Sequence, residues 1–325
     1  MIGKKLINFV KNIFIGEDKT NIAKSKVEHV KISKLKLTKD ILVQDGIKKD
    51  PPDNRDKIKE SPIKVGVSTS YTTEHTNNDQ YSIQITDTSL RSYAPDSYLF
   101  NQKQLNACGG FSGSAAIYIL MNRMQALSSG ISNKYKVPYF SPLWIYWYAR
   151  DYDGFNSTAS DCGTTLRSVM KALSNPGVVE EKVWKQYSHF VTTEPDENAK
   201  NSNKIKIHGY FRIKQDSTAP QLAKDVLAIE QLPIIAGINI YTEQLSKAYR
   251  NGIFEPVRNR DKAELIGGHA ICITGYKQIN DKTYLEFLNS WGPDFGDNGY
   301  GYFPIEWLTD DFYCFDAWTF DKKYF

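Results

Sequence analysis

The sequence of 325 residues has few cysteines and no long apolar run. Its four cysteines (Cys108, Cys162, Cys272 and Cys314) are widely spaced, which indicates neither a disulfide-dense scaffold nor a zinc site built from CxxC pairs. No apolar stretch approaches the ~20 residues that a membrane-spanning helix needs. A chain of this size does not need disulfides to hold its core together, so we expect a reducing compartment such as the cytoplasm.

The first 64 residues also lack tyrosine, tryptophan and cysteine, and they contain only 2 of the 16 phenylalanines. They carry 16 Lys and Arg against 9 Asp and Glu, whereas the remaining residues carry 25 against 28. The net charge of +4 therefore conceals a basic leader, residues 1–64, and a slightly acidic body rich in aromatic residues. We expect residues 88–325 to form the folded domain and residues 65–87, rich in Ser, Thr and Asn, to be a linker.

The beginning of the leader predicts an amphipathic helix. Residues 1–15 place Ile2, Leu6, Phe9 and other apolar side chains on one helical face. Lys11 interrupts the apolar stretch and no small-residue cleavage site follows, so the pattern is not that of a signal peptide. The leader's lysines lack interleaved aromatics, which argues against specific nucleic-acid binding. Two interpretations stay open: the leader docks on the chain's own body, or it contacts an anionic partner or membrane surface.

Cys108 lies where a buried helix is predicted to begin. The residues before it are polar and turn-like, and those from Gly109 to about Leu127 are mostly small or apolar. The dipole and free N–H groups of a first helical turn favour a thiolate, which is the nucleophilic form of cysteine. A lone cysteine is also a common small core residue. The helix start alone therefore leaves both roles open.

A β-hairpin is predicted further along the chain. Two apolar runs, residues 267–276 and 284–288, flank a polar turn that contains Asn280 and Asp281. With the turn centred near residue 279, antiparallel pairing brings His269 beside Asn289. An amide oxygen that accepts from one ring nitrogen fixes the tautomer and leaves the other nitrogen facing a nucleophile.

Together these segments resemble the papain-like cysteine peptidase family, in its bacterial and phage-type branch. The order agrees with that family: the cysteine comes first, the histidine follows 161 residues later and the asparagine 20 residues after that. Matches between the motifs extend the resemblance over roughly residues 88–320. The matching segments are Asn101-Gln-Lys-Gln104 before Cys108, Gly267-Gly-His-Ala270 through Tyr276, and Asn289-Ser-Trp-Gly292 with Gly296, Gly299 and Tyr300.

The resemblance implies a role for each matching polar residue. Cys108 would be the nucleophile, and His269 would be its general base and later the acid that protonates the leaving amine. Asn289 would orient His269. The side-chain amide of Gln102 would donate to the tetrahedral oxyanion, together with the backbone N–H of Cys108.

Three further residues gain substrate-related roles from the same resemblance. Trp291 would shield the hydrogen bond between Asn289 and His269 from water. Gly163 would lie beside an extended substrate backbone, where a missing side chain permits close approach. Gly268, next to the histidine, would leave the pocket wall less enclosed.

The chain departs from the family pattern around the nucleophile. Asn106 and Ala107 replace the usual Gly-Ser, and Gly109 replaces the usual tryptophan. Leu105 stands where secreted relatives have a disulfide-forming cysteine, which favours a reducing compartment; association with a virion is a second option. The leader lacks the long helical signature of the family's typical inhibitory pro-segment, so its removal, inhibition of the enzyme and docking all stay open.

These observations predict an α+β, papain-like two-lobed fold. We expect a helical lobe at about residues 100–195, a β-barrel-like lobe at about 205–315, and the active-site cleft between them. The expected function is a cysteine endopeptidase that acts on protein or peptide substrates without metal or cofactor. Two alternatives remain: a weak or inactive papain-fold protein with a binding or structural role, for example in a virion, and an isopeptidase.

Overall fold

The computed structural model of the chain describes residues 46–61, 86–129, 137–155 and 158–324. The amphipathic helix expected in residues 1–15 and most of the linker expected at 65–87 lie outside these residues. Within the described ranges, no helix combines the length and the apolar character that crossing a membrane requires.

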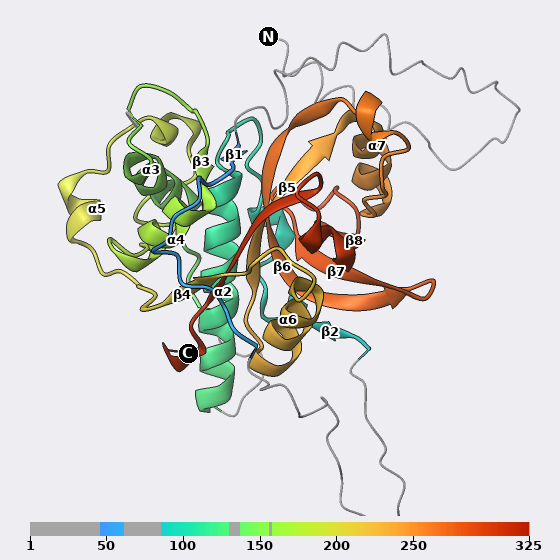
Figure 1. Cartoon of the computed structure of the whole chain (residues 1–325). Coiled ribbons are helices and arrows are strands. Elements are labelled where there is room, and N and C mark those ends of the chain that lie inside the picture. The colour runs from blue at the N-terminus through green and yellow to red at the C-terminus, as the bar shows by residue number, and fades with distance from the viewer. Residues whose placement is uncertain (1–45, 62–85, 130–136, 156–157, 325) are drawn as a thin grey trace, which may run out of the picture.

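Helices and strands occupy largely separate parts of the chain. Figure 1 shows α3, α4 and α5 on one side of the long helix α2 and the sheet on its other side. The helices are α2 (Cys108–Ser129), α3 (Pro142–Tyr152), α4 (Leu166–Ser174), α5 (Glu197–Asn201), α6 (Ala219–Asp225) and α7 (Thr242–Asn251).

The small residues at the start of α2 allow its neighbours to approach closely. A Cβ atom on Gly110 would lie 2.2 Å from the carbonyl oxygen of Pro142, so only glycine fits there. Pro142 begins α3, and the side chain of Ser141 caps that helix by accepting from the backbone N–H of Trp144 at 3.1 Å. The predicted helix after Cys108 is thus confirmed, and close packing against α3 fixes the position of its first turn.

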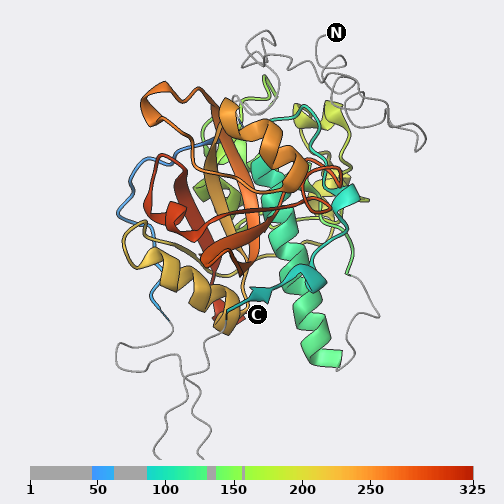
Figure 2. The ribbon, with the colours of Figure 1, turned by 90° about the vertical axis from the view of Figure 1, so that its right-hand side faces the viewer.

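The largest sheet has seven strands in the order β4-β9-β5-β6-β7-β8, with β2 pairing to β6, and its pairings are antiparallel. Figure 2 shows α2 running alongside this sheet. The predicted α+β class is therefore confirmed. The strands are β1 (Ile47–Lys48), β2 (Thr88–Ser89), β3 (Thr164–Thr165), β4 (Tyr210–Arg212), β5 (Ile234–Tyr241), β6 (Leu265–Ile279), β7 (Lys282–Leu288), β8 (Tyr300–Pro304) and β9 (Cys314–Phe320).

The hairpin of β6 and β7 turns at Asn280 and Asp281, which both adopt positive φ angles, of 48° and 60°. Asparagine and aspartate adopt this left-handed conformation at lower cost than most residues, and a two-residue hairpin loop of this kind requires it. Ile279 pairs with Lys282, so the turn is centred slightly later than residue 279, the centre expected from the sequence.

Residues 46–61, here called the strap, cross the molecule and contact residues that are far from them in the sequence. In the strap, β1 pairs in parallel with β3, and Lys59 donates from its backbone N–H to the carbonyl of Arg212 in β4 at 2.8 Å. In Figure 1 the strap is the blue segment that runs between the helices and the sheet. The end of the leader is therefore packed onto the body.

Candidate active site

Cys108 is the first residue of α2, and its side chain is fully buried. Its thiol is hydrogen-bonded to the backbone of Ala270, which directly follows His269 in β6. The start of the helix and the middle of the central strand therefore bring the cysteine and the histidine segment together, although 161 residues separate them in the sequence.

His269 is fully buried and lies 2.7 Å from Asn289, measured from Nε2 to Oδ1. The same amide oxygen accepts from the backbone N–H of Ser290 at 2.8 Å, which fixes the orientation of the amide. Because this oxygen accepts hydrogen bonds, His269 Nε2 carries the proton. Nδ1 is then the basic nitrogen, and it has no hydrogen-bond partner within the described part of the chain.

Trp291 covers this pair. Its ring centroid lies 4.7 Å from that of His269 with the planes tilted by 31°, and Phe295 packs edge-on against the indole with 5.2 Å between the ring centroids. Only 9% of Trp291 is exposed. The apolar cover keeps water from the hydrogen bond between His269 and Asn289, and a hydrogen bond is stronger where the surrounding dielectric is low.

Gln102 is tied to the same segment. Its backbone N–H donates to the carbonyl of Ser290 at 2.9 Å, and its side-chain oxygen accepts from the Ser290 hydroxyl at 2.5 Å. The side-chain nitrogen donates one hydrogen to the carbonyl of Leu105 at 2.6 Å. A primary amide has two N–H donors, so this bond leaves one of them for another acceptor.

The two predicted substrate-binding glycines both lie close to the strap. Gly163 has a positive φ of 74° and directly precedes β3, which pairs with β1. A Cβ atom on Gly268 would lie 2.3 Å from the carbonyl oxygen of Ile47. An extended segment of the chain itself therefore runs along the surface that the resemblance assigns to substrate.

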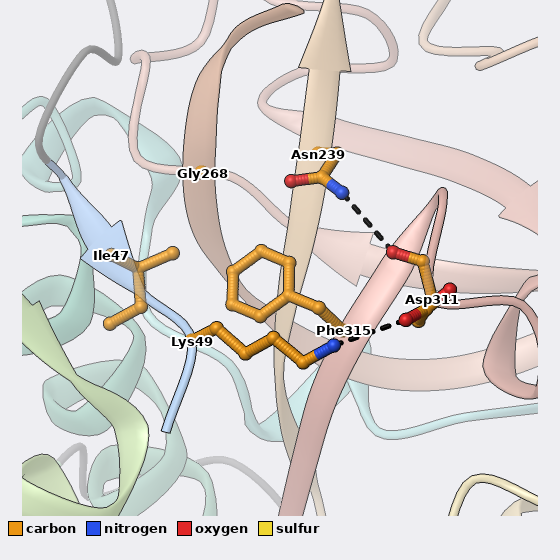
Figure 3. Close-up of a pocket in the computed structure, with 6 residues that line it drawn as sticks. All are labelled: Ile47, Lys49, Asn239, Gly268, Asp311 and Phe315. Carbon is orange, nitrogen blue, oxygen red and sulfur yellow. Dashed lines mark hydrogen bonds and ion pairs between the residues drawn. The ribbon is translucent and has the colours of Figure 1, made fainter. Parts of the chain in front are cut away.

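A pocket of about 250 Å³ opens beside this contact. Figure 3 shows the side chain of Lys49 reaching across it to Asp311, with 3.1 Å between Nζ and Oδ2. Lys48, on the opposite face of the strap, places its ammonium group over the ring of Phe155 at 4.1 Å. The pocket is lined by Ile47, Lys49, Asn239, Gly268, Asp311 and Phe315.

Beyond β1, a buried ionic network anchors the strap. Arg167 of α4 contacts Asp50 at 3.3 Å and Asp56 at 2.7 Å, and Arg212 contacts Asp56 at 3.3 Å and Asp316 at 2.9 Å. Asp50 is also hydrogen-bonded to Asp316. Three carboxyl groups thus face two guanidinium groups, and one proton held between two of the acids makes the network neutral.

Burial determines the ionisation of the groups in the groove. It raises the pKa of the Cys108 thiol to about 12 and lowers the pKa of His269 to about 4. It also raises the pKa of Asp50 to about 7, with the hydrogen bond and negative charge of Asp316 as further causes. With the strap in place, the cysteine and the histidine are therefore both neutral at pH 7.

Two parts of this site were missed by sequence reasoning. One is the ionic network around Asp50, and the other is a set of hydrogen bonds around Asp161 that joins Asn106 to Tyr146. Asp161 lies two residues before Gly163, the residue of this loop to which the resemblance gives a role, but nothing in its own neighbourhood indicates these contacts. Across the described ranges, no group of three His, Cys, Asp or Glu side chains is arranged to hold a metal ion.

Comparison with known proteins agrees with this geometry. Residues 152–306 match the model of the papain family of cysteine proteases, a range that includes His269 and Asn289 and begins after Cys108. An uncharacterised peptidase C1-like protein of Acanthamoeba polyphaga mimivirus is 29% identical over 56% of this chain and 58% of its own. Peptidase 1 of the mite Dermatophagoides pteronyssinus is 28% identical over 43% of this chain and 41% of its own. The chain thus spans about half the length of these curated relatives.

Solved structures share the fold at low sequence identity. Xylellain, a cysteine protease from Xylella fastidiosa, superposes with a TM-score of 0.65 at 21% identity and covers 93% of this chain and 99% of its own. Procathepsin L 3 of Tenebrio molitor superposes with a TM-score of 0.54 at 18% identity, over 82% of this chain and 75% of its own. The match over residues 152–306 makes this part of the chain similar to the papain family of cysteine proteases, and the solved structures show that the chain has the same two-lobed fold.

Proposed function

We propose that the chain is a cysteine endopeptidase that hydrolyses peptide bonds through a thioester. The observation that carries this proposal is the basic Nδ1 of His269. The hydrogen bond from Nε2 to Asn289 leaves Nδ1 without a partner among the described residues, and the next residue of the same strand, Ala270, contacts the Cys108 thiol. A base held in one tautomer next to a thiol is the arrangement that nucleophilic catalysis needs.

The reaction follows from these positions. His269 takes the proton of Cys108, and the thiolate sulfur attacks the carbonyl carbon of the peptide bond, whose oxygen becomes an oxyanion. The C–N bond breaks as His269 returns the proton to the leaving amine. Water, deprotonated by His269, then attacks the thioester, which releases the carboxylic acid and restores the thiol.

Incubation of the purified full-length chain with a generic peptide mixture at pH 8, where the carboxyl group of Asp50 has lost its proton and we expect the strap to leave the groove, tests this proposal. We expect new N-termini in the mixture, sequenced by mass spectrometry, and rapid labelling of Cys108 by an epoxide inhibitor. An isopeptidase would cleave lysine-branched conjugates and leave linear peptides intact. A binding protein would do neither and would not label, and either of these outcomes would contradict the proposal.

Gln102→Ala should lower kcat by about a hundredfold and change KM little, because a lost oxyanion donor weakens binding of the transition state only. The supporting geometry is the amide of Gln102, which is held by Leu105 and Ser290 with one N–H left over. Steady-state kinetics on a fluorogenic peptide measure both constants.

The matched control for Gln102 is Gln244→Ala. Gln244 is equally buried, and its side chain likewise donates to a backbone carbonyl, that of Glu255 at 2.6 Å, but it lies in α7. A merely structural contribution of Gln102 would lower the melting temperature in both variants and leave kcat within about twofold in both.

We also propose that the strap inhibits the enzyme by occupying the groove. Its support is the contact of Ile47 with Gly268, the parallel pairing of β1 with β3, and the ionic network that anchors Asp50 and Asp56. These contacts favour docking of the leader in its own cleft over docking on an anionic partner, since Lys49 and Lys59 of the strap are already paired with acidic residues of the body.

A further inference from the structure

Asp161 is the centre of a compact hydrogen-bond cluster on the helical side of the groove. Its Oδ2 accepts from the backbone N–H of Asn106 at 2.9 Å, and its carbonyl oxygen accepts from the side-chain nitrogen of Asn106 at 2.7 Å. Its Oδ1 accepts from the hydroxyl of Tyr146 at 2.6 Å. That hydroxyl in turn accepts from the backbone N–H of Gly163 at 2.8 Å. We call these four residues the Asp161 bracket.

The bracket joins three separate elements. Asn106 lies two residues before Cys108 in the turn that leads into α2, Tyr146 is a fully buried residue of α3, and Gly163 is in the loop before β3. Asp161 and Asn106 are 55 residues apart in the sequence. The cysteine near this junction, Cys162, is not in a disulfide, so hydrogen bonds provide the link described here.

The bracket also sets which backbone donor faces the groove. The N–H of Gly163 is directed inward to Tyr146, whereas the N–H of the next residue, Thr164, donates to the carbonyl of Gly46 in the strap at 3.4 Å. An extended peptide in place of the strap would meet the same Thr164 donor. The Tyr146 hydroxyl therefore holds the peptide plane that directly precedes the one whose Thr164 N–H meets the groove occupant.

We propose that Asp161 is a positioning residue that fixes the distance between the nucleophile turn and the loop that aligns the substrate backbone. This inference rests on the proposed peptidase function. If the hydrogen bonds of the bracket are lost, the scissile carbonyl is no longer held at a fixed position relative to the Cys108 sulfur. Small displacements of that kind reduce the reaction rate strongly.

The charge of Asp161 gives the proposal a second readout. Burial is the main cause of the raised pKa of the Cys108 thiol, and the negative charge on Asp161 adds to it. Removing that charge while preserving the shape of the side chain should ease formation of the thiolate. Loss of the positioning therefore predicts that turnover falls, and loss of the charge predicts that alkylation of the thiol becomes faster. Asp161→Asn should change the two rates in opposite directions.

The test uses the full-length chain and three variants. Asp161→Asn keeps the size of the side chain but leaves one acceptor for two donors, those of Asn106 and Tyr146; Tyr146→Phe removes only the hydroxyl. Asn122→Ala is the control, because Asn122 also joins two segments to α2, by donating to the carbonyl of Tyr93 and accepting from the backbone N–H of Val137, each at 3.0 Å.

For Asp161→Asn we expect kcat/KM to fall about tenfold, which corresponds to the loss of one hydrogen bond. Iodoacetamide should react with Cys108 at least about twofold faster, and the pH midpoint of this alkylation should move to lower pH. For Tyr146→Phe we expect KM for an extended peptide to rise about tenfold at nearly constant kcat, with alkylation unchanged. Asn122→Ala should lower only the melting temperature.

The proposal is overturned if Asp161→Asn and Tyr146→Phe keep kcat and KM within twofold of the parent chain. If the parent chain cleaves no peptide at all, the proposed peptidase function fails instead, and the alkylation rates still decide on the bracket. Faster alkylation in Asp161→Asn with an unchanged Asn122→Ala rate then supports it, and equal rates in all variants overturn it.

Discussion

Cys108→Ala should abolish peptide hydrolysis by the full-length chain, and His269→Ala should have an effect of the same size. When two groups act together in one catalytic step, removing either one loses nearly all of the rate acceleration that the pair provides. We therefore expect kcat to fall by about 10⁴- to 10⁶-fold in each single variant. For the same reason, the double variant should be no slower than either single one. Steady-state or single-turnover cleavage of a fluorogenic peptide measures these losses.

Cys272 supplies a matched control, because it is a second fully buried cysteine only three residues beyond His269. Burial alone accounts for its raised pKa, and it lies on β6 within the core. Cys272→Ala should lower stability by removing core packing and leave kcat within about twofold. Cleavage by Cys108→Ala at the parent rate would rule out Cys108 as the nucleophile and, with it, the proposed mechanism.

Raising the pH from 4 to 8 should weaken docking of the strap by about tenfold or more, because a group that binds a proton more tightly in the docked state favours docking only while it is protonated. The pKa of Asp50 is raised from its ordinary 3.8 to about 7 in the docked strap, so the docked state binds one more proton than the free strap between these values. This contribution to docking is therefore fully present below about pH 4, and it is lost as the pH rises through about 7. The groove should open towards neutral and alkaline pH.

The groups that face Asp50 explain this direction. Asp316 of β9 raises the pKa of Asp50 through a hydrogen bond and its negative charge, Arg167 of α4 pairs with Asp50, and Arg212 and Asp56 complete the network. Once the proton leaves, three negative charges face two positive ones in a buried place, and a buried unpaired charge is costly.

Asp50→Asn separates this effect from the titration of the catalytic groups. The amide resembles the protonated acid, so the strap should stay docked at pH 8 in the variant and dissociate in the parent chain. Limited digestion by added trypsin after Arg55, compared between the two chains at pH 5 and pH 8, reports docking without any need for turnover. Equal digestion of the two chains at both pH values would contradict the proton-linked release.

The local parts of this structure were predictable. A polar turn followed by small and apolar residues predicts the helix that begins at Cys108. The turn residues Asn280 and Asp281 predict the hairpin of β6 and β7. Both elements are encoded by neighbours in the chain. The motif spacing then led to the papain-like fold, which the model and the comparisons bear out.

The contacts between segments far apart in the sequence were not predictable from one sequence. Arg167 meets Asp50 across 117 positions, and Asp161 meets Asn106 across 55. Neither pair belongs to a periodic pattern, and an aspartate near a glycine is usual in any loop. Sequence reasoning described the leader as a possible pro-segment or docking segment but could not say where it docks. Its docking residues, Asp50 and Asp56, are ordinary in composition, and their partners lie in α4 and β4.

The neutral state of Cys108 beneath the strap has a consequence for chemical durability. Oxidation of cysteine to sulfenic and higher acids proceeds from the thiolate, and the raised pKa keeps this sulfur in its thiol form while the strap covers it. The covered chain should therefore tolerate peroxide, whereas the uncovered enzyme, whose thiol is accessible to a base and to solvent, becomes sensitive to it. The strap would then protect the Cys108 thiol from oxidation until it leaves the groove.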